Sequence, residues 1–574
     1  MKKNFVRLRW FFTMLLFVTT MIMPTMMLAE ESITPTRPKG DGEGIPYQIS
    51  NRAELYWFAG LVNGTLVGVK KDASANAILT KNIIVNEYVL DANKDLLSGR
   101  DFIPWTPIGN DWIAYTGTFD GQGHTIRGLY FNNQASCVGL FGQIGANGKI
   151  SNVRVLDSYF EFAILGGGGV CGANVGGELQ NCSNSSTVIG NRTAGGVCGM
   201  TNSGGTVINC KNTGSVRGTN TLGGVCGDNS GNITNCFNEG TVGGEDYVGG
   251  VCGENAGTIK SCYNTANVFA DREHVGSVRG SGSGEVTNCY YLSGTTEDGS
   301  AVEKSKEQFK SGEVAWLLNG KGLGEQVWGQ PLGWDQYPVL GSDYKVVKAA
   351  QGDKDANGNY TYWATFSNPT NDVTLYVPFD RTLNVYNATV SGGKLTLTQR
   401  SDDQVAKGEG VLLKTDGEYV NAKANEPNVL EKASPDENHL VATPAEVQTI
   451  KAETGYILYR LTYNDATNKK GLGFYLGVDE ANNSYHGESL KAIPGKAYLK
   501  VSVNEANDPS SAALTRSFVF GGGNETTGID GITIMGTDVQ RHGTIEGIFD
   551  LQGRKISNPT KGIYIKNNKK VIIK

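Results

Sequence analysis

GGVCG, at Gly168–Gly172, recurs at Gly195–Gly199, Gly223–Gly227 and Gly249–Gly253 in this chain of 574 residues. The cysteines of these copies are separated by 26 to 28 residues, and a second cysteine series follows with nearly the same spacing. The first series is Cys171, Cys198, Cys226 and Cys252, and the second is Cys182, Cys210, Cys236, Cys262 and Cys289. Nine of the ten cysteines are therefore periodic. Such a period indicates a structural repeat, which takes precedence over any local interpretation.

Each unit reads GGVCGxN, then GxIxNCxN, then GxV. The segments between glycines and asparagines are too short and too poor in helix formers for helices, so they are typical of short strands. A unit of about 27 residues cannot bury a core alone, so the units must stack about 4.8 Å apart. The sequence predicts an all-β chain with a parallel β-solenoid whose interior holds the cysteines and a valine column. That column is Val170, Val197, Val225 and Val251. A flexible glycine-rich linker, the alternative, predicts no fixed columns.

An asparagine precedes the second cysteine in most units. We expect these asparagines at one corner of each turn, because asparagine tolerates left-handed backbone and stacked amides can pair along the axis. They are Asn181, Asn209, Asn235 and Asn288. Cysteines on neighbouring turns come within disulfide range, but their parallel Cβ vectors suit a disulfide poorly. The sequence favours ladders of buried free thiols, with disulfides as the alternative.

The array ends in degenerate turns. Val138–Gly142 and Val275–Gly280 retain only part of the motif, so the core repeats cover about 138–291 within a solenoid region of 45–341. Near 51–63, Asn51 and Glu54 have capping spacing before an amphipathic helix. A second helix is predicted near 304–319. We expect the two helices to cover the two open ends of the solenoid, because exposed strand edges promote aggregation.

The period vanishes after residue 341. Alternating runs over 344–520, such as KLTLTQR and GVLLK, predict an antiparallel β-sandwich or barrel. Residues 521–530 are predicted to be a linker. Residues 531–574 are predicted to form a small C-terminal β module, because Gly547–Lys574 alternates apolar and polar residues around two turn signals. From Arg554 onward this module carries only basic charges.

The N-terminus has the layout of a secretory signal peptide. Basic residues precede the apolar run Trp10–Met23, and Ala29 offers a cleavage position, so residues 1–29 are predicted to be removed. Residues 30–44 are predicted to be a tether. No later window is apolar enough for a spanning helix, so we expect no transmembrane anchor in the mature chain. The net charge of -6 and the pI of about 5.6 argue against nucleic acid as a partner.

Several stretches resemble a known family. GTFDGQGHTIRGLYF at Gly117–Phe131, VGLFG at Val138–Gly142 and the GGVCG units resemble GLUG-repeat surface proteins. SGEVAWLLNG at Ser311–Gly320 and WDQYPVLG at Trp334–Gly341 resemble the segment that closes such arrays. The resemblance implies a right-handed β-helix in a secreted protein with an adhesive role. GLUG repeats also occur beside IgA-cleaving metallopeptidase domains, but the HExxH motif of the peptidase is absent here.

The C-terminus carries a second resemblance. DLQGR, KGIYI and KKVIIK, all within Gly547–Lys574, resemble the sorting modules of proteins exported across the outer membrane of Gram-negative bacteria. This resemblance implies type IX secretion or a related route, with export machinery as a partner of the C-terminal module. The expected location is the cell surface, at the outer membrane, or the extracellular space.

No catalytic, cofactor or metal site is predicted. Gly167, Gly169 and Gly172 satisfy GxGxxG, but they belong to the repeat and no strand-to-helix unit follows. Asp353–Gly358 resembles half of an EF-hand loop, but a hairpin turn is favoured. The five histidines lie in different units: His124, His274, His439, His486 and His542. A carboxylate pair such as Asp91 and Asp111 has no sequence support over any other pair.

The sequence leaves two classes of function open, and a third, structural one. The leading hypothesis is an exported, non-enzymatic, adhesin-like surface protein whose solenoid binds a host or bacterial glycan or protein. Exposed aromatic residues could stack on such a ligand or serve only packing. They are Trp105, Trp112, Tyr247 and Tyr290. The alternatives are a glycan-active β-helix enzyme, either a polysaccharide lyase or a hydrolase, and a purely structural surface component.

Overall fold

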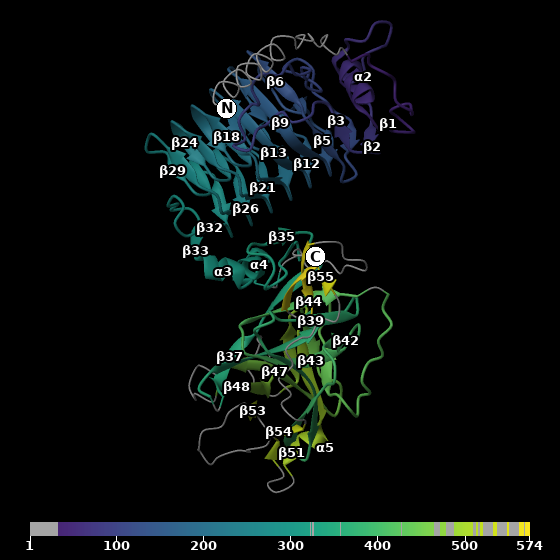
Figure 1. Cartoon of the computed structure of the whole chain (residues 1–574). Coiled ribbons are helices and arrows are strands. Elements are labelled where there is room, and N and C mark those ends of the chain that lie inside the picture. The colour runs from purple at the N-terminus through teal and green to yellow at the C-terminus, as the bar shows by residue number, and fades with distance from the viewer. Residues whose placement is uncertain are drawn as a thin grey trace, which may run out of the picture.

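The computed structural model describes residues 33–508, except 322, 324–325, 356, 426, 464–470 and 478–486. Beyond residue 508 it describes 513–514, 517–519, 532–535, 548–549, 562–566 and 569–573. The predicted signal peptide and the predicted linker over 521–530 lie outside these residues. A parallel β-solenoid fills the upper half of Figure 1 and antiparallel sheets fill the lower half. The predicted fold class is therefore confirmed, while the right-handed turn implied by the family resemblance stays a prediction.

The solenoid has four parallel sheets. The nine-stranded sheet contains β1 (Tyr47–Ile49), β2 (Ala77–Leu79), β4 (Thr118–Asp120), β8 (Lys149–Ser151), β12 (Glu178–Gln180), β16 (Thr206–Ile208), β21 (Asn232–Thr234), β26 (Thr258–Lys260) and β31 (Glu285–Thr287). The six-stranded sheet contains β7 (Phe141–Ile144), β11 (Cys171–Asn174), β15 (Cys198–Thr201), β20 (Cys226–Asn229), β25 (Cys252–Asn255) and β30 (Arg279–Ser281). Each turn of the core repeat adds one strand to each of these sheets.

The other two sheets complete the turn. The five-stranded sheet contains β10 (Gly167–Gly168), β14 (Ala194–Gly195), β19 (Asn220–Gly223), β24 (Asp246–Gly249) and β29 (Val275–Gly276). The thirteen-stranded sheet contains β3 (Ile83–Ile84), β5 (Thr125–Arg127), β6 (Tyr130–Asn133), β9 (Arg154–Phe162), β13 (Ser183–Gly190), β17 (Lys211–Asn212), β18 (Ser215–Gly218), β22 (Phe237–Asn238), β23 (Val242–Gly244), β27 (Tyr263–Asn264), β28 (Val268–Ala270), β32 (Tyr290–Leu292) and β33 (Val302–Lys304).

The interior is filled by apolar columns that run along the axis. Val170, Val197, Val225 and Val251 are fully buried, as the sequence predicts. In the nine-stranded sheet, the central residue of each strand from β4 to β26 adds a second column. Its members are Phe119, Ile150, Leu179, Val207, Ile233 and Ile259, all fully buried. Both columns belong to one continuous core that also contains the cysteines.

A column of buried asparagines fixes the register of the turns. Asn184, Asn212, Asn238 and Asn264 lie in register on neighbouring strands and are almost fully buried. The Nδ2 atom of each of the first three donates to Oδ1 of the next at 2.8–2.9 Å. Each Oδ1 also accepts the backbone N–H two residues ahead at 3.1–3.3 Å. These amides tie every turn both to itself and to its neighbour.

The asparagine column explains the second glycine of GGVCG. A Cβ atom on Gly169, Gly196 or Gly224 would overlap the side chain of the asparagine packed against it, Asn184, Asn212 or Asn238. Any residue other than glycine would therefore displace the buried amides. The motif and the asparagine column form one packing unit.

Helix α2 covers the first turn. It spans Arg52–Asn63, its N-cap Asn51 accepts the N–H of Glu54 at 3.1 Å, and it ends at Gly64, which has a φ of +72°. Phe58 of α2 packs against the rings of Tyr115 and Phe119 inside the solenoid. Figure 1 shows α2 beside β1 and β2 at one end of the solenoid, as the sequence predicts.

The predicted tether is folded in its described part, residues 33–44. The Thr36 N–H donates to the carbonyl oxygen of Ala53 in α2 at 3.1 Å, and Lys39 bridges Gln48. The Arg37 guanidinium lies 5.8 Å from the centre of the Trp57 ring. These contacts hold the segment against α2 and β1, so the expectation of a free tether is wrong for these residues.

The C-terminal helical segment differs from its prediction in two ways. The predicted helix near 304–319 is divided into α3 (Lys306–Lys310) and α4 (Glu313–Leu318) at Gly312, which has a φ of +91°. The segment also covers the outer side of the thirteen-stranded sheet rather than the end of the solenoid. There an aromatic column, Phe237, Tyr263 and Tyr290, packs against Phe309, Val314, Leu318 and Trp328.

The last turn is closed by the loop 293–301 instead. Oδ2 of Asp298 accepts the N–H groups of Val278 and Arg279, both at 2.7 Å. In the same loop, the Thr296 hydroxyl donates to the carbonyl oxygen of Val268, and Thr295 shares a hydrogen bond with the Ser277 hydroxyl. These contacts satisfy backbone groups that a further turn would otherwise pair.

The β module that begins at residue 344 contains three main sheets. The four-stranded sheet contains β36 (Tyr344–Lys348), β44 (Tyr419–Ala424), β39 (Val373–Tyr376) and β42 (Gln404–Val405). The six-stranded sheet contains β37 (Ala350–Lys354), β38 (Tyr360–Ser367), β43 (Gly410–Thr415), β40 (Leu383–Ser391), β41 (Lys394–Gln399) and β54 (Ile532–Met535). The five-stranded sheet contains β45 (Leu440–Ala442), β50 (Ala497–Ser502), β47 (Tyr456–Tyr463), β48 (Leu472–Leu476) and β53 (Ser517–Val519).

The six-stranded sheet of the module is buried on both faces. Val411 and Leu413 face one core with the four-stranded sheet, while Leu412 faces a second core with the five-stranded sheet. The module is therefore a three-layer stack of mainly antiparallel sheets, where the sequence predicts an antiparallel β-sandwich or barrel. The apolar run GVLLK in β43 is the signal of a strand buried on both faces.

Shorter elements complete the described structure. They are β34 (Trp328–Gly329), β35 (Val339–Leu340), β46 (Gln448–Lys451), β49 (Ser489–Ala492), α5 (Val503–Ala506), β51 (Asn507–Asp508) and β52 (Ala513–Leu514). At the C-terminus, β55 (Ile548–Phe549), β56 (Gly562–Lys566) and β57 (Lys569–Ile573) form the predicted small antiparallel sheet. The strand β54 adds to β41 in parallel, which the sequence does not predict.

We expect Asn238→Ala to destabilise the solenoid by about 2–3 kcal/mol, because it leaves buried amide and backbone groups of the column without partners. The measurement is the free energy of unfolding of the solenoid transition in the mature protein, followed by calorimetry and denaturant titration.

Asn232→Ala, on the exposed side of the same turn, is the matched control, and we expect it to change stability by less than about 0.5 kcal/mol. Equal effects of the two substitutions would contradict the role of the buried column.

Candidate binding face

The first cysteine series forms a column in the six-stranded sheet. Cys171 pairs in register with Cys198, which pairs with Cys226, which pairs with Cys252. Phe141 precedes this column and Arg279 follows it. All four cysteines are fully buried free thiols. Burial raises the pKa of Cys171 and Cys226, so these groups stay protonated at neutral pH.

The second series forms a column at the turn after the nine-stranded sheet. The N–H groups of Cys182, Cys210 and Cys236 each donate to Sγ of the next cysteine of the series at 3.3–3.4 Å. The series continues through Cys262 to Cys289, and all five are buried free thiols. Each sulfur thus occupies interior space and accepts or donates weak hydrogen bonds, which is a packing role.

The predicted corner asparagines have left-handed backbone. Asn181, Asn209, Asn235 and Asn288 have φ values of +53° to +54°. Nδ2 of Asn209 donates to Oδ1 of Asn181 at 3.2 Å, and Nδ2 of Asn181 donates to Oδ1 of Asn152 at 3.0 Å. The hydrogen-bonded run stops at Asn209, whose buried Oδ1 has no partner among the described residues. Further along the column, Oγ of Ser261 accepts from Asn288 at 2.9 Å. These amides lie at the rim of the nine-stranded sheet.

The outer side of the nine-stranded sheet presents two columns of mostly polar side chains. Each strand from β4 to β31 directs its first and third residues outward, on either side of a central residue that is buried, or half-buried in β31. The first column is Thr118, Lys149, Glu178, Thr206, Asn232, Thr258 and Glu285, and the second is Asp120, Ser151, Gln180, Ile208, Thr234, Lys260 and Thr287. We call this surface the outer face. Its members are exposed or half-buried, and neighbours in a column are about 4.8 Å apart.

Other parts of the chain cover much of the thirteen-stranded sheet. In the N-terminal half, the carbonyl oxygen of Lys94 accepts from Thr187 at 2.5 Å, and Asp95 forms an ion pair with Arg217. In the C-terminal half, α3 and α4 cover the aromatic column described above. The outer face has no comparable cover among the described residues. It therefore belongs to the longest sheet of the solenoid that other described segments leave uncovered.

The chemistry of the outer face suits hydroxyl-rich or peptide ligands. Its centre, on β16 and β21, carries hydroxyl, amide and aliphatic groups, while charged residues lie toward the ends. Hydroxyls and amides both donate and accept hydrogen bonds. A rigid array of such groups, repeated at the strand spacing, can contact a long ligand at many points.

The remaining sequence candidates are not assembled into a site. Oδ1 of Asp91 accepts the N–H groups of Asn93 and Asp95 within its own loop, and the structure records no contact of Asp91 with Asp111. Asp355 and Gly358 form the predicted hairpin turn between β37 and β38. Among the described residues, no group of three His, Cys, Asp or Glu side chains is placed to hold a metal ion.

The candidate aromatic residues serve different roles. Trp105 is buried, and its Nε1 donates to the carbonyl oxygen of Gly139 at 3.0 Å, so the expectation that it is exposed is wrong. Tyr290 is buried under α3 and α4. Tyr247 stacks on His274 with ring centres 4.4 Å apart. Trp112 is 93% exposed and is the one of the four that is free to meet a ligand.

Comparison with the sequences of known proteins gives local similarity only. No family model matches the chain. It is 31% identical over 167 residues to "Halomucin" of Haloquadratum walsbyi, which covers 27% of this chain and 2% of halomucin. It is 32% identical over 87 residues to a "Putative Gly-rich membrane protein" of Evansella cellulosilytica, covering 15% of this chain and 10% of that protein. The chain thus spans a small fraction of both relatives.

The chain is also similar to a solved structure, the crystal structure of "a putative immunoglobulin A1 protease from Bacteroides ovatus". The TM-score is 0.39 and the sequence identity is 20%. The match covers 54% of this chain and 95% of that chain. Among the described residues of this chain, no helix is long and apolar enough to cross a membrane.

We expect none of the ten thiols to react with dithiobis(nitrobenzoic acid) within minutes in the folded protein, because all ten are buried. After denaturation without a reductant, all ten should react. The measurement is the absorbance of the released thionitrobenzoate. Fewer than ten reactive thiols in denaturant would indicate disulfides and contradict the free-thiol ladders.

Proposed function

We propose that this protein is an exported, non-enzymatic surface protein that uses its solenoid as a binding scaffold. The observation that carries the proposal is the outer face, a flat and mostly polar surface that continues over successive turns without cover from other described residues. The ligand is a glycan or a protein of a host or bacterial surface. Affinity arises from many weak contacts spread along the face.

The rigidity of the scaffold supports this role. The buried columns hold the outer side chains at fixed spacing, so little conformational entropy is lost when a ligand binds. Hydroxyl and amide groups in register, such as Thr206, Asn232 and Thr258, match the repeated polar groups of an extended chain. A binding face of this kind needs no cofactor and no reacting group.

The resemblances of the sequence support the location. The signal-peptide layout, the GLUG-like units and the C-terminal stretch similar to type IX sorting modules all agree with export to the cell surface or beyond. One similar protein is named as a membrane protein, which agrees with a place at the cell envelope. The export machinery is then the partner of the C-terminal module.

Glycan and host-protein arrays probed with the mature protein test the proposal. We expect binding to members of at least one array. The double variant Thr206→Arg/Thr258→Arg places two long cationic side chains at the centre of the outer face. We expect it to weaken binding at least about tenfold, which is about 1.4 kcal/mol, because the flat contact is lost.

Thr241→Arg is the matched control, since Thr241 is exposed but lies away from the nine-stranded sheet. We expect it to bind like the parent protein. A clean negative on both arrays, or equal binding by the double variant, would contradict the proposal. New reducing ends or new double bonds after incubation with polysaccharides would instead favour a glycan-active enzyme.

A further inference from the structure

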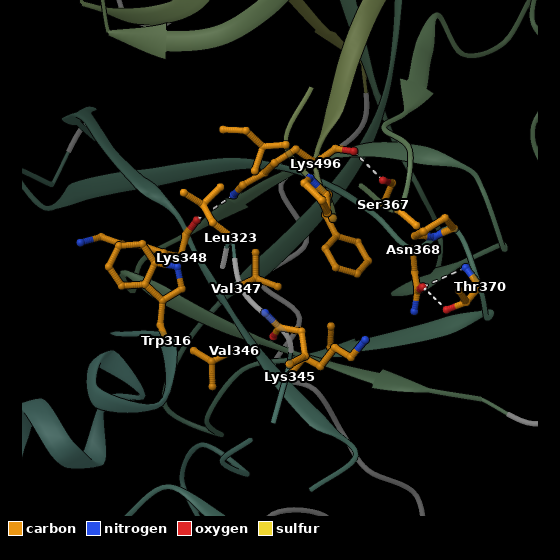
Figure 2. A pocket seen from close by; sticks show the side chains of 18 of the residues that line it. Trp316, Leu323, Lys345, Val346, Val347, Lys348, Ser367, Asn368, Thr370 and Lys496 are labelled. Carbon is orange, nitrogen blue, oxygen red and sulfur yellow. Dashed lines mark hydrogen bonds between the residues drawn. The ribbon is translucent and has the colours of Figure 1, made fainter. Parts of the chain in front are cut away.

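A second candidate site, which shares no lining residue with the outer face, lies where α4 meets the β module. A cavity of about 550 Å³ opens between α4, β36 and the segments 366–370 and 493–496 (Figure 2). Ligand sites for small molecules commonly have volumes of about 300–1,000 Å³. The cavity is therefore large enough to enclose much of a small organic ligand.

The walls of the cavity are mainly apolar. Its lining includes Trp316, Val347, Phe366, Ala422, Val447 and Ile493. Val447 and Ile493 are large apolar side chains that remain exposed, at 46% and 38%. Such a lining would gain free energy by burying an alkyl or aromatic group.

Four lysines contribute to the same cavity. Lys348 is paired, because its Nζ lies 2.7 Å from Oε1 of Glu418 and 4.7 Å from the centre of the Trp316 ring. Lys496 extends across the upper side of the cavity in Figure 2, and its Nζ donates to the carbonyl oxygen of Lys348 at 3.3 Å. Lys345 and Lys496 form no ion pair with any described residue, and Lys321 is the fourth lysine of the lining. Glu446, the one described acid in the lining, is exposed.

The amide nitrogen of a buried asparagine adds a further donor. Asn368 is only 7% exposed, and its Oδ1 accepts both the N–H and the Oγ1 hydroxyl of Thr370, at 3.1 Å and 2.9 Å. Its Nδ2 donates to none of the described residues. Besides the exposed side chains of Gln326 and Glu446, the cavity offers hydrogen-bond donors, namely the ammonium groups of Lys345 and Lys496 and the amide nitrogen of Asn368.

We propose that this cavity binds a small amphiphilic carboxylate, a ligand with an apolar body and one carboxylate group. The apolar body would lie on the wall formed by Phe366, Val447 and Ile493, and the carboxylate would pair with the ammonium groups. An anion there offsets the cost of holding cations partly out of water without an anionic partner. A neutral ligand of the same shape does not offset the cost of keeping the lysine ammonium groups partly out of water, so it binds more weakly.

The charge state of Lys496 gives the site a pH dependence. Burial lowers the pKa of Lys496 to about 8, and burial also lowers the pKa of Lys345. The other charged groups of the cavity lining are Lys321, Lys345, Lys348 and Glu446. A bound carboxylate favours the protonated lysine, so affinity is high below pH 8 and falls as the pH rises above this value.

The experiment is a titration of the mature protein with sodium octanoate, followed by calorimetry, with octanamide as the neutral probe. We expect octanoate to bind at least about tenfold more tightly than octanamide at pH 7, and to lose most of this advantage by about pH 10. We expect Lys496→Met and Lys345→Met each to weaken octanoate binding about tenfold while octanamide binding stays unchanged. In Lys496→Met, the pH dependence near 8 should disappear.

Lys394→Met is the control, because Lys394 is exposed on β41 and does not line the cavity. Circular dichroism identifies any variant that fails to fold. If either Lys496→Met or Lys345→Met fails to fold, the other variant provides the test. Equal binding of octanoate and octanamide, no binding of octanoate at millimolar concentration, or unchanged affinity in the folded lysine variants would each overturn the proposal. None of these outcomes bears on the outer face.

Discussion

The stacked asparagine amides inside the solenoid fix the register of its turns, and the positions of the other side chains depend on that register. Asn184, Asn212 and Asn238 each donate to the next turn and also accept from their own backbone, so these turns can join only in one register. The same side chain needs a glycine opposite it, which makes the GGVCG motif a packing requirement. Loops between the fixed points vary in length by one or two residues without moving the columns. A chain this rich in glycine gains order from a repeated polar contact as much as from apolar burial.

This constraint acts on the inward side of each strand and leaves the residue types on the outward side free to vary. Inward positions repeat the same residue types from turn to turn, because the asparagine, valine and cysteine columns accept little else. Outward positions of the nine-stranded sheet differ in every turn, from lysine to glutamate to threonine. The scaffold thus fixes where the outer side chains lie and leaves their chemistry free. A surface with fixed side-chain positions and variable side-chain chemistry suits a binding role, because its specificity can change without any change in the scaffold.

Spacing alone was enough to predict the solenoid, its valine and cysteine columns and the capping by Asn51. It was not enough to decide which asparagine of NCxN points inward, because both recur with the same period. Asn181 lies at the rim and Asn184 in the core. The aromatic column that begins at Phe237 was missed for a related reason, since it occupies a position that carries Ser183 and Lys211 in earlier turns. The cavity could not be predicted, because Trp316 and Lys496 are far apart in the sequence and line one cavity only in the folded chain.

The aromatic column also determines how the two halves of the molecule are joined. Phe237, Tyr263 and Tyr290 would expose a strip of apolar surface if α3 and α4 did not cover it. The segment after α4 is in turn held by Asn421 of β44, which accepts the N–H of Leu332 at 2.6 Å and donates to the carbonyl oxygen of Gln330 at 2.7 Å. The β module is therefore attached through packed side chains rather than a free linker. Because the cavity has walls from both α4 and the module, a ligand that binds there also stabilises this junction.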